Sequence, residues 1–511
     1  MSVTPESHQI NDKREIFGWT MYDWANSAFS TTVGTVFLGP YLTSIAEEAS
    51  KTTNGYLYLA DIPIRFDSFF TYCVSASVLF QVTFLPILGT LADYSHLRKR
   101  LLMLFSTIGA LTTLLMFFIR PGGQWMGGLL FIVANLAFGA SIVFYNSFLP
   151  SIASADQRDH VSAQGFALGY VGGGLLLCLN LIMFLFSEAL GLSESMVARI
   201  SLASAGVWWL VFSMITFRTL RSRHAIRPLP PGETYISMGF NQLASSMEVP
   251  THIVVTLMLL PLAIPVLIFL RVPIVLALLP GLGPLSVMAI FMLRKSRTMP
   301  EVIKYLIAYL LYNDGIQTVI AVSAIYAAEE LGMAVTNRIL VILMIQFVAF
   351  GGAYGFSFLA RRLGTRNAIV LSLVVWSVVV VYAFAGMQST VIVEQFGVEQ
   401  RELEFWILGS VVAIVLGGSQ ALSRSLFAQM IPQDHYAEFF SFYEVSERGT
   451  SWMGTFVFGV VNQSFGSMRM GILSVIFFFV SGLLVLLTVD IPQAIREAKN
   501  TPEMVADSEI L

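Results

Sequence analysis

Two short segments of the chain each place a carboxylate and an amide inside an otherwise apolar stretch. They read Tyr22-Asp-Trp-Ala-Asn26 and Tyr312-Asn-Asp-Gly-Ile-Gln317. A charged side chain at the centre of a bilayer costs roughly 3 kcal/mol on insertion scales, so such a residue usually faces an internal cavity and marks the path of a substrate or an ion. Both segments therefore predict a transport site.

In the first segment, Asn26 follows Asp23 by one helical turn, which puts both side chains on the same face of a helix. A substrate or ion path is one interpretation of this pair. The other is a polar contact that holds two helices together.

The second segment lies deeper in its apolar stretch. Asp314 is about ten residues beyond Lys304, roughly 15 Å along a helix, and therefore near the middle of a bilayer. Burial favours the protonated acid and a nearby cation favours the carboxylate, so an acid that alternates between these surroundings can carry a proton. Asn313 and Gln317, with Tyr312, are expected to hydrogen-bond a substrate. The alternative is a structural role.

Two later segments add polar groups to apolar stretches. Glu444 and Arg448 are spaced four residues apart on one helical face, which fits an ion pair within the helix. In a functional interpretation, Arg448 pairs with Asp314 or with a substrate carboxylate in competition with Glu444. Gln420 is a further candidate for substrate binding. Arg424 lies near the expected cytoplasmic end of its helix, where either gating or snorkelling would explain it.

The composition identifies the elements that must position these residues. Of 511 residues, 56% are hydrophobic and 12% are charged, and the mean hydropathy is +0.74, which predicts an all-α polytopic membrane protein. Apolar runs long enough to cross a bilayer fall at about 16–45, 67–92, 101–119, 126–150, 162–187, 197–217, 303–328, 336–359, 367–386, 405–428, 438–463 and 469–489.

Between these two sets of six lies a different kind of segment. A basic linker leads to a stretch in which Ile236, Phe240, Leu243 and Met247 share one helical face, as in an interfacial helix. Two proline-interrupted apolar runs at about 251–270 and 272–293 then predict a hairpin or a broken re-entrant pair. The expected total is about fourteen spans. The expected domains are 1–217, an N-terminal six-helix half; 218–302, the linker and hairpin; 303–490, a C-terminal six-helix half; and 491–511, a tail.

The two halves repeat one another in sequence. The junction Gly89-Thr-Leu-Ala-Asp93 to Arg98 aligns without a gap with Ser357-Phe-Leu-Ala-Arg361 to Arg366, and two further correspondences follow in the same order. Most of the 29 Lys and Arg residues fall on one side if the N-terminus is cytoplasmic. The positive-inside rule therefore predicts that both termini are cytoplasmic.

The 6+6 arrangement resembles the major facilitator superfamily and, within it, the vacuole effluxer family, whose autophagy-related member is associated with the release of amino acids from the vacuole. The resemblance extends over nearly the whole chain except 249–293. It rests on Tyr22-Asp-Trp-Ala-Asn-Ser-Ala-Phe29, Phe144-Tyr-Asn-Ser-Phe-Leu-Pro150, Gly165-Phe-Ala-Leu-Gly-Tyr-Val-Gly-Gly-Gly174, Tyr312-Asn-Asp-Gly-Ile-Gln317 and Gly417-Gly-Ser-Gln-Ala-Leu-Ser-Arg-Ser425.

The resemblance assigns roles to several residues. The first helix of each half lines the central cavity in this superfamily, which implies that Asp23 and Asn26 could bind an ammonium group or carry a coupling proton. Asp93 with Arg98, Lys99 and Arg100 resembles the superfamily's cytoplasmic gate, in which an acid at a helix end pairs with basic groups in one conformation only. Arg361 replaces that acid in the second half.

These features predict a secondary active transporter that works by alternating access and exports a small polar metabolite such as a neutral amino acid, with H⁺ as a candidate coupling ion. Two alternatives stay open: a transporter of a lipid or lipophilic compound, and a non-transporting sensor on a transporter fold. The short loops favour a bacterial inner membrane over a vacuolar one.

The sequence lacks the motifs of other function classes. It contains no phosphate-binding loop, no nucleophile elbow, no basic nucleic-acid patch and no His/Cys cluster with metal spacing. We therefore expect no enzymatic activity, no cofactor, no metal and no nucleic-acid partner, and infer no obligatory protein partner. The expected partners are the lipid bilayer and a small-molecule substrate.

Overall fold

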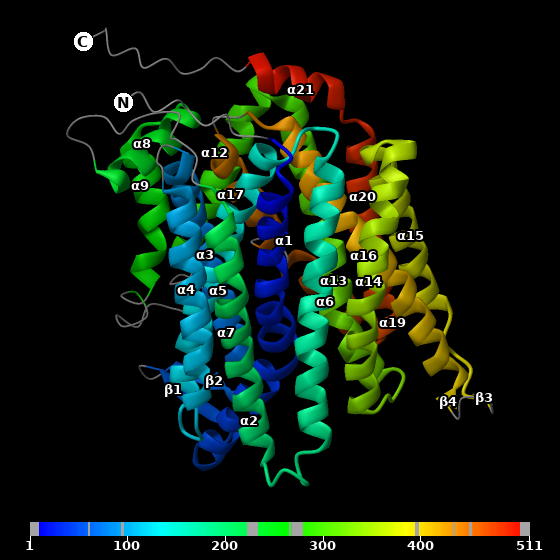
Figure 1. Cartoon of the computed structure of the whole chain (residues 1–511). Helices are drawn as coiled ribbons and strands as arrows, with labels where there is room; N and C mark the ends of the chain where they lie inside the picture. Colours follow the sequence, from blue (N-terminus) through cyan, green and yellow to red (C-terminus); the bar gives the residue numbers. More distant parts are fainter. Residues whose placement is uncertain are drawn as a thin grey trace.

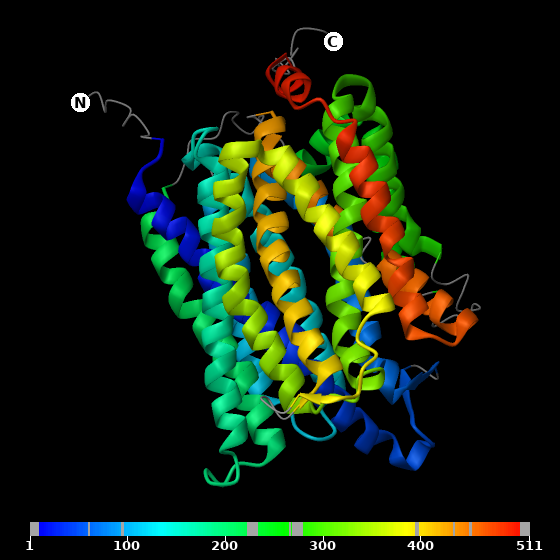
Figure 2. The same ribbon diagram turned by 90° about the vertical axis from the view of Figure 1, so that its right-hand side faces the viewer.

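The computed structural model describes residues 10–59, 62–93, 97–221, 234–264, 267, 279–393, 398–432, 435–448 and 452–500. Long helices run side by side in one bundle, and both ends of the chain lie at the same end of it (Figure 1). We call this end the terminal face. The helix α21 crosses the terminal face, whereas the strand pairs lie at the opposite end, as the turned view also shows (Figure 2).

The N-terminal half contains six long helical runs and one small hairpin. In the hairpin, β1 (Tyr56–Leu59) pairs antiparallel with β2 (Ile62–Arg65). The helices are α1 (Lys13–Ala28), the π-helical η1 (Phe29–Phe37), α2 (Leu38–Ser50), η2 (Lys51–Thr53), η3 (Phe66–Ser68), α3 (Phe69–Asp93), α4 (Arg98–Leu115), η4 (Met116–Phe118), α5 (Gln124–Ile152), α6 (Arg158–Leu185) and α7 (Glu194–Thr219).

A middle segment separates the halves, and a second set of long helices follows it. The middle segment contains α8 (Tyr235–Ser246), α9 (Thr251–Leu259), η5 (Leu260–Ala263), η6 (Leu279–Gly281) and α12 (Leu282–Thr298). The C-terminal half contains α13 (Pro300–Glu329), α14 (Val335–Leu363), α15 (Thr365–Ala385), the paired strands β3 (Ile392–Val393) and β4 (Val398–Glu399), α16 (Gln400–Met430), α17 (Tyr436–Arg448), α18 (Trp452–Phe465), α19 (Met468–Ser474), α20 (Ile476–Leu487) and α21 (Ile491–Asn500).

The count of about fourteen spans is not confirmed. Among the described residues, ten helices are long and apolar enough to cross a membrane, or eleven if one bent pair is counted as a span. The run α1–η1–α2 and the helix α17 are not among the ten. The first is rich in Ser and Thr, and the second carries four charged side chains in thirteen residues. These are the helices in which the sequence predicts polar function.

The predicted hairpin is described only in part. Its first arm, α9 with η5, meets α8 at an angle of 110°, and its turn at 268–278 lies outside the described residues, as does the basic linker at 222–233. The helix α8, expected at the membrane interface, packs against α3, where Thr90 Oγ1 donates a hydrogen bond to the carbonyl of Gly239 at 3.1 Å. Its Leu243 is fully buried.

The middle segment bridges the two halves near the terminal face. While α8 packs against α3, the ring of Phe291 on α12 stacks against Phe442 on α17 with their centroids 3.6 Å apart. Phe291 also contacts Phe439 of the same helix edge-on. One short segment therefore contacts both sides of the line along which the halves meet.

Close helix packing around Asp23 depends on glycine. A side chain at Gly172 of α6 would meet the backbone oxygen of Trp24 at 2.5 Å, and one at Gly165 would meet the carboxylate of Asp23 at 2.5 Å. Small residues let helix backbones approach in this way. The glycines of α6 thus bring α1 close enough to place Asp23 inside the bundle.

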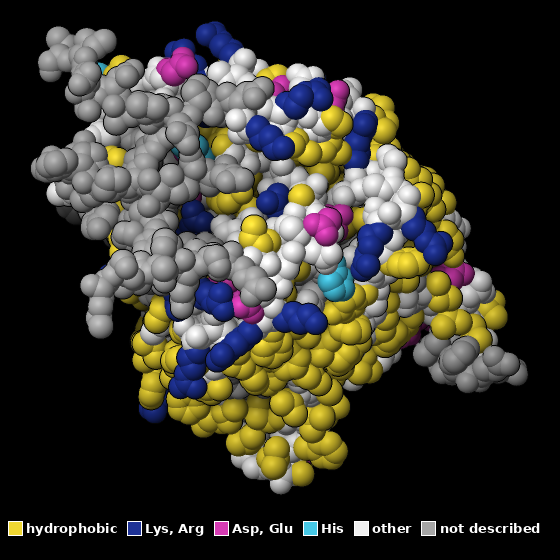
Figure 3. Space-filling view, turned by 45° about the horizontal axis from the view of Figure 1, so that its top comes forward, with side chains coloured by type: hydrophobic (Ala, Val, Ile, Leu, Met, Phe, Trp, Pro, Cys, Tyr) yellow, Lys and Arg dark blue, Asp and Glu magenta, His cyan; other side chains and the backbone are white. Residues whose placement is uncertain are grey.

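The surface has the charge distribution expected of a membrane protein. In a view with the terminal face forward, Lys and Arg side chains gather on that face, and hydrophobic side chains cover the flank of the bundle (Figure 3). This distribution is the pattern on which the predicted orientation rests. The orientation itself stays a prediction.

Candidate transport site

A cavity of about 690 Å³ lies between the two halves. Helices α1, α3, α5 and α6 form one wall, and α13, α14, α16 and α17 form most of the other. Charged groups line it: Asp23, Arg338, Arg424, Glu444, Glu447 and Arg448. Amides of both halves line it too: Asn26, Gln81, Asn135, Asn146, Gln317, Gln346 and Gln420. The apolar remainder would exclude water around these groups, which strengthens their interactions.

Asp23 and Arg424 form an ion pair across the two halves. Arg424 Nη1 lies 3.2 Å from Asp23 Oδ2, which also accepts a hydrogen bond of 2.7 Å from the hydroxyl of Tyr145. Arg424 is only 3% exposed, and its guanidinium lies 4.1 Å from the ring centroid of Phe166. It donates two further bonds to Ser162. A buried pair with this many partners is costly to break from one side only.

A second ion pair is joined to the first through Asn146. The side-chain oxygen of Asn146 accepts from Arg424 Nη1 at 3.3 Å, and its amide nitrogen donates to Glu444 Oε1 at 2.9 Å. The other oxygen of Glu444 accepts from Arg448 Nε at 3.2 Å. The resulting chain of contacts crosses three times between the halves, so neither ion pair can change without affecting the other.

The predicted site residues divide into two groups. Asp23, Asn26, Gln317, Gln420, Glu444, Arg424 and Arg448 all line the cavity. Gln420 accepts a 2.5 Å hydrogen bond from Tyr170 of the opposite half. Arg424, expected near the cytoplasmic end of its helix as a gating or snorkelling residue, lies among the charged groups of the cavity, and its gating role stays a prediction.

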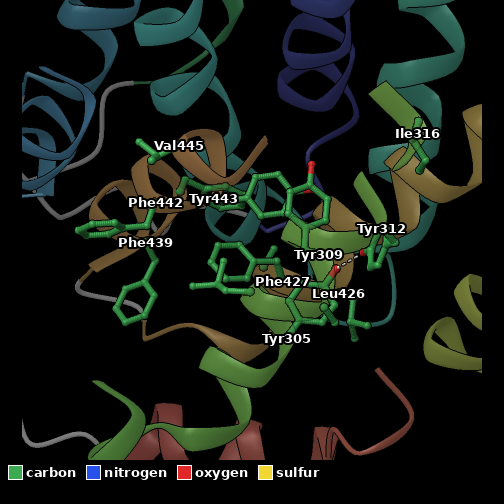
Figure 4. Packing of buried hydrophobic residues seen from close by; sticks show 14 of the residues in the cluster. Tyr305, Tyr309, Tyr312, Ile316, Leu426, Phe427, Phe439, Phe442, Tyr443 and Val445 are labelled. Carbon is green, nitrogen blue, oxygen red and sulfur yellow. Dashed lines mark hydrogen bonds between the residues drawn. The ribbon is translucent and has the colours of Figure 1, made fainter. Parts of the chain in front are cut away.

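Tyr312, Asn313 and Asp314 do not line the cavity. The hydroxyl of Tyr312 lies 2.7 Å from Ser423 Oγ, and Asn313 donates to the backbone oxygen of Glu447 at 3.2 Å. Tyr312 belongs to a cluster of aromatic rings contributed by α13, α16 and α17 (Figure 4). The substrate-binding role expected for Tyr312 and Asn313 stays a prediction without support from their location, and the proton-carrier role expected for Asp314 stays a prediction too.

Asp93 joins the halves at the terminal face. Its carboxylate accepts hydrogen bonds from the backbone amides of Ala437 (2.9 Å) and Glu438 (2.8 Å) in the first turn of α17, and pairs with Arg98 at 2.8 Å. A carboxylate at a helix N-terminus is favoured by the unpaired amides and by the helix dipole. In the described part of the chain, no ion pair connects Asp93 with Lys99 or Arg100.

A second contact joins the halves at the terminal face, and its acid also belongs to the N-terminal half. Here the acid is Asp159, at the start of α6, and it accepts 2.6 Å hydrogen bonds from Thr365 and Ser425. Arg158 also donates to the backbone oxygen of Ala428 at 3.0 Å. The halves are therefore bonded together at the terminal face, and the cavity extends from the charged groups toward the other end of the bundle.

His435 adds a titratable group to this contact. Its Nδ1 lies 2.7 Å from Glu438 Oε2. Burial by itself lowers the pKa of His435, but the hydrogen bond and charge of Glu438 and the charge of Asp93 outweigh it, so the pKa is raised above 6.5. The charge of Lys295 acts against this shift.

Sequence reasoning missed Tyr145, Asn146 and Asp159 as site residues. Tyr145 and Asn146 lie in the segment Phe144–Pro150 that supports the family resemblance, but neither was assigned a role. Both are polar residues in a long apolar run, which is the signal that identified Asn26. Because Tyr145 and Asn146 carry no charge, they were not selected as candidates.

Comparison with known proteins identifies the family. The family model described as "Vacuole effluxer Atg22 like" matches residues 11–262 and 284–499, so it also covers α9, which was expected to lie outside the resemblance. An uncharacterized MFS-type transporter of Bacillus subtilis, YxiO, is 29% identical, covering 92% of this chain and 93% of its own. Autophagy-related protein 22 of Coccidioides immitis is 25% identical, covering 98% and 90%.

Solved structures show the same fold. The proton:xylose symporter XylE aligns with a TM-score of 0.62 over 93% of this chain and 94% of its own, at 12% identity. A bacterial homologue of the iron transporter ferroportin, in its outward-facing state, aligns with a TM-score of 0.57 over 95% and 99%, at 13% identity. The predicted all-α major facilitator fold is confirmed, and the chain is an integral membrane transporter that belongs to the vacuole effluxer family.

Proposed function

We propose that the chain is a secondary active transporter that exports a small zwitterion, such as a neutral amino acid, in exchange for protons. The observation that carries the proposal is the charge pattern in the cavity. One acid from each half and two arginines of the C-terminal half lie within one hydrogen-bonded network. An amino acid carries the same two charges and can exchange with them.

The chemistry of each end of the substrate matches a group in the network. A carboxylate fits the guanidinium of Arg448, which can donate two parallel hydrogen bonds. An ammonium group fits Glu444, Glu447 or Asp23, all of which line the cavity. A zwitterion that separates a buried ion pair supplies a partner for each of the two charges. A neutral or singly charged compound leaves at least one of them unpaired. This argument also weighs against a lipophilic cargo.

Alternating access follows from the position of the network. The contacts Asp23–Arg424 and Asn146–Glu444 cross between the halves, so the halves can part at the terminal face only when these contacts break together with those of Asp93 and Asp159. A ligand shifts such an equilibrium by its differential affinity for the two states. A zwitterion that compensates the separated charges supplies this difference.

Transport can be tested with the purified protein in liposomes. We expect a labelled mixture of neutral amino acids to exchange across the membrane and to accumulate when a pH gradient is imposed. Arg448→Gln should abolish both processes. The matched control is Glu48→Gln, which removes an exposed charge outside the cavity and should transport as the wild type does. Unaltered transport in Arg448→Gln, or transport of lipid but of no amino acid, would contradict the proposal.

A further inference from the structure

Asp314 is a buried acid that the substrate network does not use. It is 1% exposed and lies in the middle of α13. Gln317, one turn further along, lines the cavity, but Asp314 does not. Thr318, one turn further along on the same face, also lines the cavity, so the carboxyl group of Asp314 lies just beyond the cavity wall, within the C-terminal half.

Two helices pack tightly on this side of α13. A side chain at Gly454 of α18 would lie 2.9 Å from Asp314 Oδ2 and 2.1 Å from Thr318 Oγ1. One at Gly315 would lie 3.1 Å from the ring of Phe479 on α20. The backbone of α18 thus lies directly against the carboxyl group, and the hydroxyl of Thr318 is already donated to the backbone oxygen of Asp314 at 2.7 Å.

In the part of the chain that the structure describes, Asp314 takes part in no ion pair. Neither carboxyl oxygen has a hydrogen-bond partner among the described residues. The helices α18 and α20 contain no ionisable side chain, and residues 449–451, which precede α18, are Gly, Thr and Ser. The acid therefore has only backbone and neutral side chains around it on this side.

The other helices packed on α13 direct their charges elsewhere. On α17, Arg448 pairs with Glu444, Glu447 lines the cavity, and Glu438 pairs with His435. On α16, Arg424 pairs with Asp23. On α14, Arg338 lines the cavity, and Arg361 and Arg362 are in its last turn. On α12, Arg294 lies 3.7 Å from Glu248, and Lys295 and Arg297 are in the last turn. The helix α21 crosses the terminal face.

A carboxylate buried without a counter-charge loses its charge by binding a proton, because a lone charge is strongly disfavoured in apolar surroundings. Resting on the proposed function, we propose that Asp314 is the coupling-proton site of this transporter, separate from the substrate cavity and loaded in the conformation described here. When the halves part at the terminal face and α18 moves away from α13, the O–H bond breaks and the proton passes to water on that side.

The position of the proton site determines in which conformation the transporter binds the proton and in which it binds substrate. The conformation with the terminal face closed holds a proton at Asp314 and has its cavity open for substrate release. The opposite conformation loses the proton and gains substrate from the terminal side. Protons and substrate therefore move in opposite directions, as export against a concentration gradient requires.

The test uses the wild-type protein in liposomes and N,N′-dicyclohexylcarbodiimide, which modifies protonated carboxyl groups in apolar surroundings. We expect mass spectrometry to locate the modification at Asp314, and its extent to fall as pH rises. Infrared spectroscopy should show a protonated carboxylic acid band that Asp314→Asn removes. The matched control is Asp23→Asn, which removes the corresponding acid of the first half and should leave the labelling of Asp314 intact.

Transport separates this proposal from the proposed function. Asp314→Asn should lose accumulation driven by a pH gradient, so that its uptake with a gradient equals its uptake without one. Failure of amino-acid transport with labelling and infrared band intact would overturn the substrate assignment and keep the proton site. Three results would overturn the proton site: no labelling of Asp314 at any pH, protection of Asp314 by Na⁺ rather than by high pH, or gradient-driven accumulation that survives in Asp314→Asn. If Asp314→Asn fails to fold, the pH dependence of carbodiimide labelling and of the infrared band in the wild-type protein tests the proton site.

Discussion

Asp23 and Asp314 occupy the first helix of each half, and both are nearly inaccessible to solvent, yet their surroundings are opposite. Asp23 has Arg424 and Tyr145 within 3.2 Å, whereas Asp314 has no hydrogen-bond partner in the described part of the chain. The partner of Asp23 belongs to the other half, and the neighbours of Asp314 belong to its own. The comparison teaches that acids on the matching first helices of the two halves can differ in role, one as a contact between the halves and the other as a site within its own half.

The largest effect is expected from Arg424→Gln, which leaves the carboxylate of Asp23 buried with only Tyr145. Breaking a buried ion pair from one side costs about 3–5 kcal/mol, so thermal unfolding in detergent should occur at a clearly lower temperature and transport should be lost. The double variant Asp23→Asn/Arg424→Gln should regain much of the stability. If the single variant is as stable as the wild type, the pair does not hold the halves together.

Next in size is the difference between Asp23→Asn and Asp314→Asn. The first leaves Arg424 with a weaker partner and should cost roughly 1–3 kcal/mol. The second replaces a neutral acid by a neutral amide of the same shape and should change stability by less than about 1 kcal/mol. Unfolding curves of the two purified variants at one pH make the comparison. Equal losses would mean that both acids are charged and paired.

A smaller effect is expected at the terminal face. Asp93→Asn weakens the hydrogen bonds to the first turn of α17, and losing a helix cap costs about 1 kcal/mol. The population should therefore shift toward the conformation in which the terminal face is open. Thiol labelling of Ser425→Cys, a buried position at this contact, should be faster in the Asp93→Asn background. Asp67→Asn, at an exposed position near the opposite end, should leave the rate unchanged.

The smallest effect is a pH dependence from His435. Because the pKa of His435 is raised above 6.5 in the folded protein, its pairing with Glu438 stabilises the fold fully below that value and is lost as pH rises through the raised pKa. Wild-type unfolding temperature should fall over this range relative to His435→Gln. A variant with the same pH profile as the wild type would show that other groups titrate there.

The fold was predictable from the sequence to a large extent. Apolar runs of bilayer length define most of the long helices, and the order of the repeated junctions gave the two halves. The exact count of spans was less accessible, because α1 and α17 contain the polar residues of the cavity and the middle segment is interrupted by proline. Polar residues that line the cavity lower the mean hydropathy of the helix that contains them. The helices α1 and α17 therefore have a weak hydropathy signal.

The sequence allowed most candidate site residues to be selected, but it did not show which of them contact one another. Asp23, Glu444 and Arg448 could be selected because a charge in an apolar run is rare. The pairing of Arg424 with Asp23 could not be predicted. The two residues are 401 positions apart, and only the packing of the halves brings them together. The neutral residues Tyr145 and Asn146 carry no such signal. Asp314 was selected correctly as a buried acid, but sequence spacing does not tell which side of α13 faces the cavity.

The middle segment has a consequence for how fast the protein can work. One part of it is bonded to α3 through Thr90, and another stacks on α17 through Phe291. Separation of α3 from α17 must therefore break one of these contacts and remake it in every cycle. Stacked aromatic contacts of this kind are worth about 0.5–1.5 kcal/mol beyond their buried area, enough to slow turnover by about twofold to thirteenfold if the contact is broken in the transition state. The segment can thus add to the barrier of each cycle although none of its described residues lines the cavity.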